Sequence, residues 1–162
     1  LNGFNLKNNI KVIASGKVIT GFNIIKNVAL GADMVNSARA MMLALGCIQA
    51  LECNKNICPT GVATQDPNLI QGLNVNDKYI RVAKYHHETV ESVIDLLSAT
   101  GNSSMKELNR YDINRRISHT EVKRFDEIYP IIEVGSYING EIPNNLSQAY
   151  SIADANSFMP SL

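Results

Sequence analysis

The first clear pattern along the chain is a short apolar run followed by an amphipathic segment. Residues 10–14 read IKVIA, a β-branched run that ends at Ser15 as a buried strand ends in a turn. Thr20 can then cap a helix over residues 21–30, and Gly31 stands where such a helix stops. The apolar positions of this helix are spaced as in a helix that lies on a sheet.

The same pattern repeats immediately. Residues 32–36, ADMVN, predict a second short strand, and Ser37 is a candidate cap for a helix over residues 38–45 that ends at Gly46. Two consecutive strand–helix units predict a parallel sheet of the β/α class.

The following stretch to Asp66 is rich in Asn, Pro, Thr and Gly and is predicted to be irregular. A long helix is predicted over residues 77–99. Its expected buried stripe repeats every three or four positions: Ile80, Ala83, His87, Val90, Ile94 and Leu97.

Weaker signals follow. Residues 105–109 predict a short helix, and Ser118 with Glu121 forms a capping-box pattern for a helix that ends at Tyr129, before a proline. We therefore expect three parts: residues 1–66 with the β/α units and the irregular segment, residues 67–130 as a helical region packed on them, and residues 131–162 as an extended tail.

Composition narrows the class of protein. The chain has 162 residues, 45% of them hydrophobic, and its formal net charge is zero. This favours an ordinary globular domain and disfavours nucleic acid or an anionic membrane as the main partner, because both select basic surfaces. The apolar run around residues 38–51 is too polar for a membrane span, and unpaired thiols favour a reducing, cytoplasmic location.

The loops after the two predicted strands carry groups that suit an anion. In β/α folds these loops present backbone N–H groups to phosphates. Glycine allows close approach of the backbone, and serine, lysine and arginine add polar or charged groups. The candidate residues are Ser15, Gly16, Lys17, Asn36, Ser37, Ala38 and Arg39. The alternative is that Ser15, Thr20 and Ser37 are only turn and cap residues.

The three cysteines all fall in one segment. Cys47, Cys53 and Cys58 follow the pattern C-x5-C-x4-C-P. An odd number of thiols cannot be fully paired in disulfides, and clustered thiolates of this kind hold iron–sulfur clusters, in which a ligand cysteine is often followed by proline. Zinc is the alternative, with a fourth ligand such as His119 or one from outside the chain. A buried, purely structural role remains open for Cys47.

The remaining candidate residues have simpler interpretations. His86 and His87 lie within the long predicted helix, where surface and core-edge positions are expected. The chain has no Ser-His-Asp arrangement, P-loop or dinucleotide fingerprint.

The unbroken order of these features carries a family resemblance. The segment from IKVIASGKVITG to CPTGVATQDP resembles the end of the FMN-binding domain of glutamate synthase, as found in the shorter FMN-binding glutamate synthase-like proteins. The later stretch RRISHTEVKRFDEIYP is similar to the closing region of those proteins. The resemblance covers most of residues 10–130.

The resemblance implies the last two units of a (β/α)8 TIM-type barrel, followed by an iron–sulfur loop and C-terminal helices. It implies FMN held at its phosphate by Ser15, Gly16, Lys17 and the Asn36–Arg39 loop, and a [3Fe-4S] cluster on Cys47, Cys53 and Cys58. The ASGK sequence replaces a two-glycine turn of larger glutamate synthases, so backbone contacts to the phosphate are expected more firmly than side-chain contacts. Because such a barrel needs roughly 250 residues, and the chain starts at Leu1 without an initiator methionine, we expect it to be part of a longer protein.

The implied function is that of an oxidoreductase acting on CH–NH2 donors, in which reduced FMN drives formation of L-glutamate from 2-oxoglutarate and ammonia or glutamine. The implied partners are 2-oxoglutarate, an amino-group source, the N-terminal part of the barrel, and an electron donor such as ferredoxin or a nicotinamide-linked subunit. Catalytic residues are expected outside this chain. The alternatives are an N-methylglutamate synthase-like subunit acting on methylamine, and a non-enzymatic interaction module stabilised by zinc or a cluster.

Overall fold

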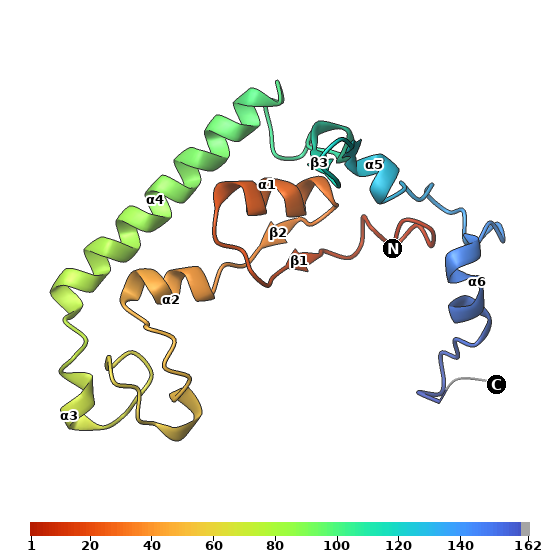
Figure 1. The fold of residues 1–162 in the computed structure, drawn as a ribbon. Coiled ribbons are helices and arrows are strands. Elements are labelled where there is room, and N and C mark those ends of the chain that lie inside the picture. Colours follow the sequence, from red (N-terminus) through yellow and green to blue (C-terminus); the bar gives the residue numbers. More distant parts are fainter. Residues whose placement is uncertain (160–162) are drawn as a thin grey trace. The chain divides into compact units, whose positions relative to one another are not determined.

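The computed structural model describes residues 1–159 and divides the chain into two units. One unit is Val12–Tyr129, and the other combines Leu1–Lys11 with the segment that begins at Pro130 (Figure 1). The last three residues of the tail expected over 131–162 lie outside the described residues. The three-part division expected from the sequence stays a prediction.

The larger unit begins with two strand–helix pairs. They are β1 (Ile13–Ala14), α1 (Gly21–Ala29), β2 (Met34–Val35) and α2 (Arg39–Leu45). The strands pair in parallel, with Ile13 opposite Met34 and Ala14 opposite Val35. The predicted order of elements is confirmed, although each strand is two residues long instead of five. Ile13 and Met34 remain 53% and 51% exposed, so the described unit leaves apolar strand side chains uncovered.

The two helices begin differently. Thr20 caps α1 as predicted, because its side chain accepts a hydrogen bond from the Asn23 N–H while the Asn23 side chain accepts from the Thr20 N–H. The prediction that Ser37 caps α2 is wrong, since the cap position is Ala38, without a side-chain hydrogen bond. The Ser37 hydroxyl instead donates to the Val18 carbonyl oxygen at 2.8 Å, a partner from the preceding loop that sequence spacing does not reveal.

The irregular segment after α2 contains η1 (Cys53–Lys55) and α3 (Pro67–Ile70). The long helix is then α4 (Val75–Ala99), which confirms the prediction with two additional residues at its start. It packs against both α1 and α2. Among residues 1–159, no helix combines the length and the hydrophobicity needed to cross a lipid bilayer.

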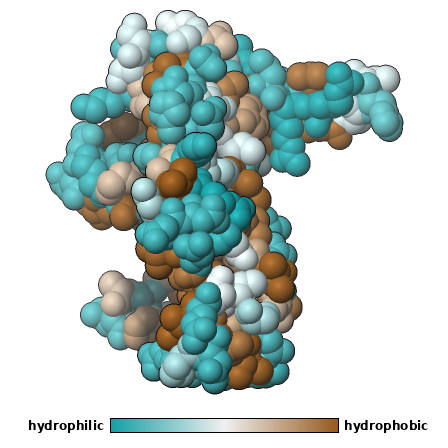
Figure 2. Space-filling model, turned by 90° about the vertical axis from the view of Figure 1, so that its left-hand side faces the viewer, coloured by the Kyte–Doolittle hydropathy of each residue, from teal (hydrophilic) through white to brown (hydrophobic). Residues whose placement is uncertain are grey.

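The expected buried stripe of α4 is largely wrong. Ile80 and Ile94 are 42% and 49% exposed, whereas the side that packs carries Val82, Tyr85 and Leu96. Figure 2 shows the side of the molecule on which α4 lies, where hydrophobic side chains interrupt a hydrophilic surface. The helix has two apolar faces with the same period, so periodicity alone could not indicate which of them is covered.

The core of the larger unit joins α1, the second half of α4 and the segment beyond it. Its buried members are Ile25, Ala29, Leu108, Ile113 and Phe125. Side chains from α4, including Val93, Leu96 and Leu97, pack against this cluster. The core therefore holds α1, the first helix of the β/α region, against α4.

Beyond α4, the structure differs from the sequence-based expectation. Residues 105–109 contain a turn at 105–107 and no helix. The helix predicted from Ser118 starts later, because the Ile117 and Ser118 N–H groups both donate to the Glu121 carbonyl oxygen and close an antiparallel hairpin. Its predicted end is confirmed, since the helix is present from Phe125 and Tyr129 is its C-cap residue. The elements here are η2 (Arg110–Asp112), β3 (Asn114–Arg116), β4 (Val122–Arg124) and α5 (Phe125–Ile128).

The smaller unit is held by contacts between its two segments. The Tyr137 N–H donates to the Gly3 carbonyl oxygen at 2.9 Å, and the rings of Phe4 and Tyr137 meet edge to face. The segment after Pro130 also contains α6 (Asn144–Ser151), so it is not extended throughout as expected.

Candidate functional site

A cleft of about 580 Å³ lies beside the loops that follow β1 and β2. Six of the seven predicted anion-binding residues line it, and Ser37 is the exception. The full lining is Ser15, Gly16, Lys17, Val18, Asn36, Ala38, Arg39, Met42, Cys47, Gln49, Leu51 and Cys53. The structure thus brings both predicted loops and two of the three cysteines to one place.

Parallel strand pairing explains why the two loops meet. Because β1 and β2 run in the same direction, the segments after both strands leave from the same edge of the sheet. The Asn36 N–H donates to the Ala14 carbonyl oxygen at 2.8 Å and extends the pairing beyond β2. The bond from Ser37 to Val18 then ties the second loop to the first.

The β1–α1 loop has two consecutive residues in the left-handed region, which non-glycine residues seldom adopt. Gly16 and Lys17 have positive φ angles of 94° and 54°, and a Cβ added at Gly16 would meet no atom within 4 Å. Consecutive N–H groups in such turns form concave anion-binding surfaces. Within residues 1–159, the N–H groups of Gly16 and Lys17 donate no hydrogen bond to the protein, so both can serve a ligand.

The charge of the cleft also suits an anion. Among residues 1–159, the charged residues that line it are Lys17 and Arg39, and no carboxylate does. Both cations come from the predicted loops. A phosphate group at this position would meet backbone donors and two positive side chains without a competing acid.

The cysteines are only partly gathered. Cys47 follows the left-handed Gly46 that ends α2, and its N–H donates to the Met42 carbonyl oxygen at 2.9 Å. Cys53 is exposed at the start of η1, and both thiols line the cleft. Cys58 is 6% exposed and lies outside the lining.

In the part of the chain that the structure describes, no three Cys, His, Asp or Glu side chains are close enough together to hold a metal ion. The donor types suit an iron–sulfur cluster, but their placement does not fit one in this conformation. His119 likewise does not complete a zinc site with the thiols.

Cys58 has a distinct chemical environment. Its sulfur lies 3.4 Å from the Thr60 hydroxyl oxygen. This hydrogen bond, followed by bonds from backbone N–H groups of Ala63, Thr60 and Val62, lowers the pKa of the Cys58 thiol from 9.0 to about 7, while burial acts in the opposite direction. The turn after Cys58 is closed by the Gly61 N–H, which donates to the Cys58 carbonyl oxygen at 3.2 Å.

Two features of this region were not found from the sequence. A second cleft of about 650 Å³ lies between α2 and the first half of α4, with Met41, Leu45 and Val82 in its wall and His86 among its lining residues. Tyr85 reaches from α4 to the loop before α1, where its hydroxyl donates to the Ile19 carbonyl oxygen. No local sequence pattern predicts the second cleft or the Tyr85–Ile19 hydrogen bond, because both depend on how α4 packs against the rest of the unit.

Comparison with known proteins finds the same family in each match reported below. A family model described as the conserved region in glutamate synthase matches residues 1–103. The chain is 45% identical over 104 residues to the glutamate synthase large subunit-like protein YerD of Bacillus subtilis, a match that covers 64% of this chain and 20% of that protein. It is 37% identical over 103 residues to the archaeal glutamate synthase (NADPH) of Methanocaldococcus jannaschii, covering 64% and 20%. The matched region of the Azospirillum brasilense glutamate synthase (NADPH) large chain is 29% identical over 115 residues, covering 70% and 7%. The chain therefore spans about a fifth or less of the length of these relatives.

Proposed function

Because the chain belongs to the glutamate synthase family, we propose that it supplies the phosphate-binding end of an FMN site in a glutamate-forming oxidoreductase. The observation that carries this proposal is the cleft that joins the loops after β1 and β2. Its volume of about 580 Å³ lies within the range usual for cofactor sites.

In this proposal the protein binds and orients the cofactor. The free N–H groups of Gly16 and Lys17 donate to phosphate oxygens, and the side chains of Lys17 and Arg39 balance the negative charge. When bound, FMN supplies hydride transfer. The contribution of this chain is to anchor one end of the cofactor, which restricts where its other end can lie.

We further propose that Cys47, Cys53 and Cys58 hold a [3Fe-4S] cluster in the complete protein. The support is the chemistry of three thiols within twelve positions, two of them in the same cleft as the anion-binding loops. Because Cys58 lies outside that cleft, cluster binding requires the segment that carries it to move.

For the fold, we propose that the two β/α units are the end of a (β/α)8 barrel. The parallel pairing of β1 with β2, the helix after each strand, and the half-exposed strand residues Ile13 and Met34 support this proposal. The remaining strands, the 2-oxoglutarate site and the catalytic groups would then come from outside this chain. Two of the relatives named above, the archaeal and the Azospirillum proteins, carry NADPH in their names, which favours a nicotinamide-linked electron donor over ferredoxin.

The test uses the complete protein, purified with its natural cofactors. We expect bound FMN, iron and acid-labile sulfide in a 3:4 ratio, and glutamate formation that depends on 2-oxoglutarate and an amino donor. Ammonia, glutamine and methylamine would be compared as donors to separate glutamate synthase from N-methylglutamate synthase activity. A protein that carries zinc and binds no flavin would contradict the proposal and support an interaction module.

A further inference from the structure

Three side chains hold the segment between the anion-binding loop and α1. Asn23 accepts hydrogen bonds from the N–H groups of both Ile19 and Thr20, at 3.1 and 3.2 Å. The Val18 carbonyl oxygen is held by Ser37 at 2.8 Å, and the Ile19 carbonyl oxygen by the hydroxyl of Tyr85. Asn23 lies on α1, Ser37 in the loop before α2 and Tyr85 on α4. The segment is therefore held by three different parts of the unit.

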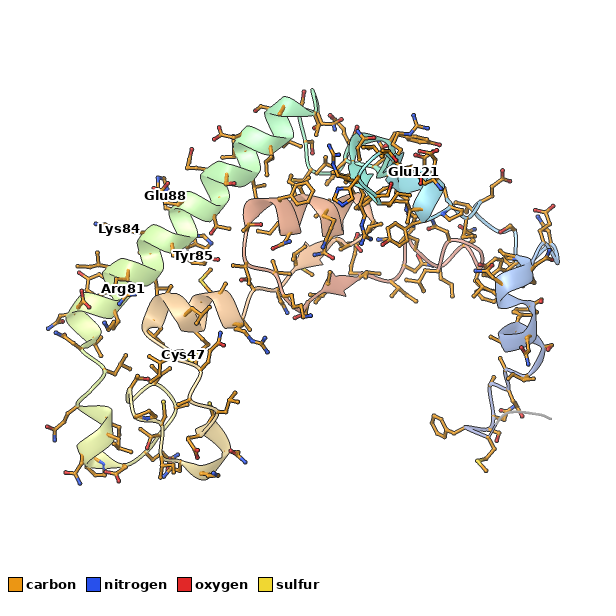
Figure 3. The ribbon with its side chains drawn as sticks, viewed as in Figure 1. Cys47, Arg81, Lys84, Tyr85, Glu88 and Glu121 are labelled. Atoms are coloured by element: carbon orange, nitrogen blue, oxygen red, sulfur yellow. The ribbon has the colours of Figure 1, made fainter. Side chains whose placement is uncertain are left out.

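Tyr85 is the most distant of these partners in sequence, 66 positions from Ile19. It projects from the side of α4 that faces α1 and α2, whereas Lys84 and Glu88 lie on the opposite side of the helix (Figure 3). Its backbone carbonyl oxygen also accepts a hydrogen bond from the Thr89 hydroxyl at 2.7 Å. The Tyr85 hydroxyl therefore reaches the loop from the interior of a 25-residue helix and not from one of its ends.

The held segment adjoins the residues that remain available to a ligand. Gly16 and Lys17 have positive φ angles and N–H groups that make no hydrogen bond to the described part of the protein. Their neighbours Val18 and Ile19 have carbonyl oxygens held by Ser37 and Tyr85. Releasing those carbonyls would let the loop adopt other backbone angles and would lower the fraction of molecules ready to bind.

We propose that Tyr85 and Ser37 are positioning residues, which hold the β1–α1 loop in the conformation that binds the phosphate of FMN. This inference rests on the function proposed above. It assigns Ser37 a role different from the direct phosphate contact expected from the sequence. It also adds to the site a residue of α4 that does not line the cleft.

The experiment compares the affinities of the complete, cofactor-stripped protein for FMN and for riboflavin, which lacks the phosphate. Tyr85→Phe removes one hydroxyl and Ser37→Ala another. We expect each change to weaken FMN binding about threefold to tenfold, the effect of one hydrogen bond, and to leave riboflavin binding unchanged. Inorganic phosphate should compete with FMN less effectively in both variants than in the wild type.

The control for Tyr85→Phe is Tyr79→Phe, and the control for Ser37→Ala is Ser98→Ala. Both control residues lie on α4. Tyr79 is 62% exposed and does not line the cleft beside the β1 and β2 loops. In the part of the chain that the structure describes, the Ser98 hydroxyl bonds only within its own helix, to the Ile94 carbonyl oxygen. Both controls should retain the wild-type ratio of FMN to riboflavin affinity. Thermal unfolding of all four variants would reveal a general loss of structure, and if Tyr85→Phe does not fold, the result for Ser37→Ala decides.

The outcomes separate the two proposals. A wild-type preference for FMN over riboflavin that is unchanged in Tyr85→Phe and Ser37→Ala would overturn the positioning role and leave the proposed function intact. Equal loss of FMN and riboflavin affinity would show a general structural role and would also overturn it. A wild-type protein that binds neither flavin would overturn both proposals.

Discussion

Gly21, the first residue of α1, lies directly against Ser92 of α4. A Cβ added to Gly21 would come within 2.7 Å of the Ser92 hydroxyl oxygen and 3.0 Å of the Ser92 backbone carbon. Real Cβ atoms do not come this close to other atoms, so a side chain at position 21 would force α1 or Ser92 to shift. The same two helices are in contact where Tyr85 of α4 donates to the Ile19 carbonyl oxygen, just before α1.

Gly21→Ala should therefore destabilise the protein by about 1–3 kcal/mol, the usual cost of inserting a methyl group into a packed contact. The measurement is the free energy of unfolding in urea. Adding Ser92→Ala should restore part of the loss, because it removes the hydroxyl but leaves the backbone contact. A double variant no more stable than Gly21→Ala would show that the hydroxyl is not part of the clash.

Gly61 and Gly101 form a natural comparison. Both have positive φ angles, 73° and 77°, but a Cβ on Gly61 would lie 2.5 Å from the Leu69 carbonyl oxygen, whereas one on Gly101 would meet nothing within 4 Å. Gly101→Ala should cost about 1 kcal/mol for the backbone angle alone. Gly61→Ala should cost clearly more and should increase proteolysis in the segment from Cys58 to α3. Equal urea midpoints for the two variants would contradict the predicted clash.

The Cys58 thiol should ionise near neutral pH in protein prepared without metal. Its pKa is lowered from 9.0 to about 7, chiefly by the Thr60 hydroxyl. Since the pKa of Cys58 in the folded state lies below its ordinary value, the ionised thiolate stabilises the folded state. This stabilisation is fully present above pH 9 and is lost as pH falls through 7. The measurement is the pH dependence of alkylation by iodoacetamide, with the Cys58 peptide quantified by mass spectrometry.

Thr60→Val should shift the midpoint of Cys58 alkylation upward, and Thr60→Ser should retain the wild-type midpoint because it keeps the hydroxyl. Burial of Cys58 slows the reaction at every pH, so the midpoint is the informative quantity, not the absolute rate. An identical midpoint in Thr60→Val would rule out the hydroxyl as the main cause.

The two cations of the cleft should contribute to FMN affinity through the phosphate. Lys17→Gln and Arg39→Gln are each expected to weaken FMN binding about tenfold to a hundredfold, as for hydrogen bonds that involve a charged group. Riboflavin affinity should not change. Lys26→Gln, on α1 and outside the cleft, is the control. Binding is measured by flavin fluorescence at several salt concentrations, and an equal effect on both flavins would contradict a phosphate contact.

The sequence alone determined the local features of this protein. The strand–helix order, the Thr20 cap and the long helix predicted over residues 77–99 follow from periodicity and cap chemistry, which act over a few residues. The same local patterns also indicated six of the residues that line the cleft, because a loop after a parallel strand lies at the same sheet edge as its neighbour. They failed at Ser118, where a capping-box pattern occurs in a hairpin turn.

Only the tertiary structure decided which groups meet across long sequence separations. It covered the Tyr85 face of α4 and left Ile80 and Ile94 exposed, although both faces are apolar. In the structure Ser37 does not cap a helix, and its hydroxyl donates to the Val18 carbonyl oxygen. The Tyr85 hydroxyl donates to the Ile19 carbonyl oxygen, 66 positions away. The physical reason is that a hydrogen bond or a buried contact depends on distance in space, which the spacing of residues along a chain does not specify.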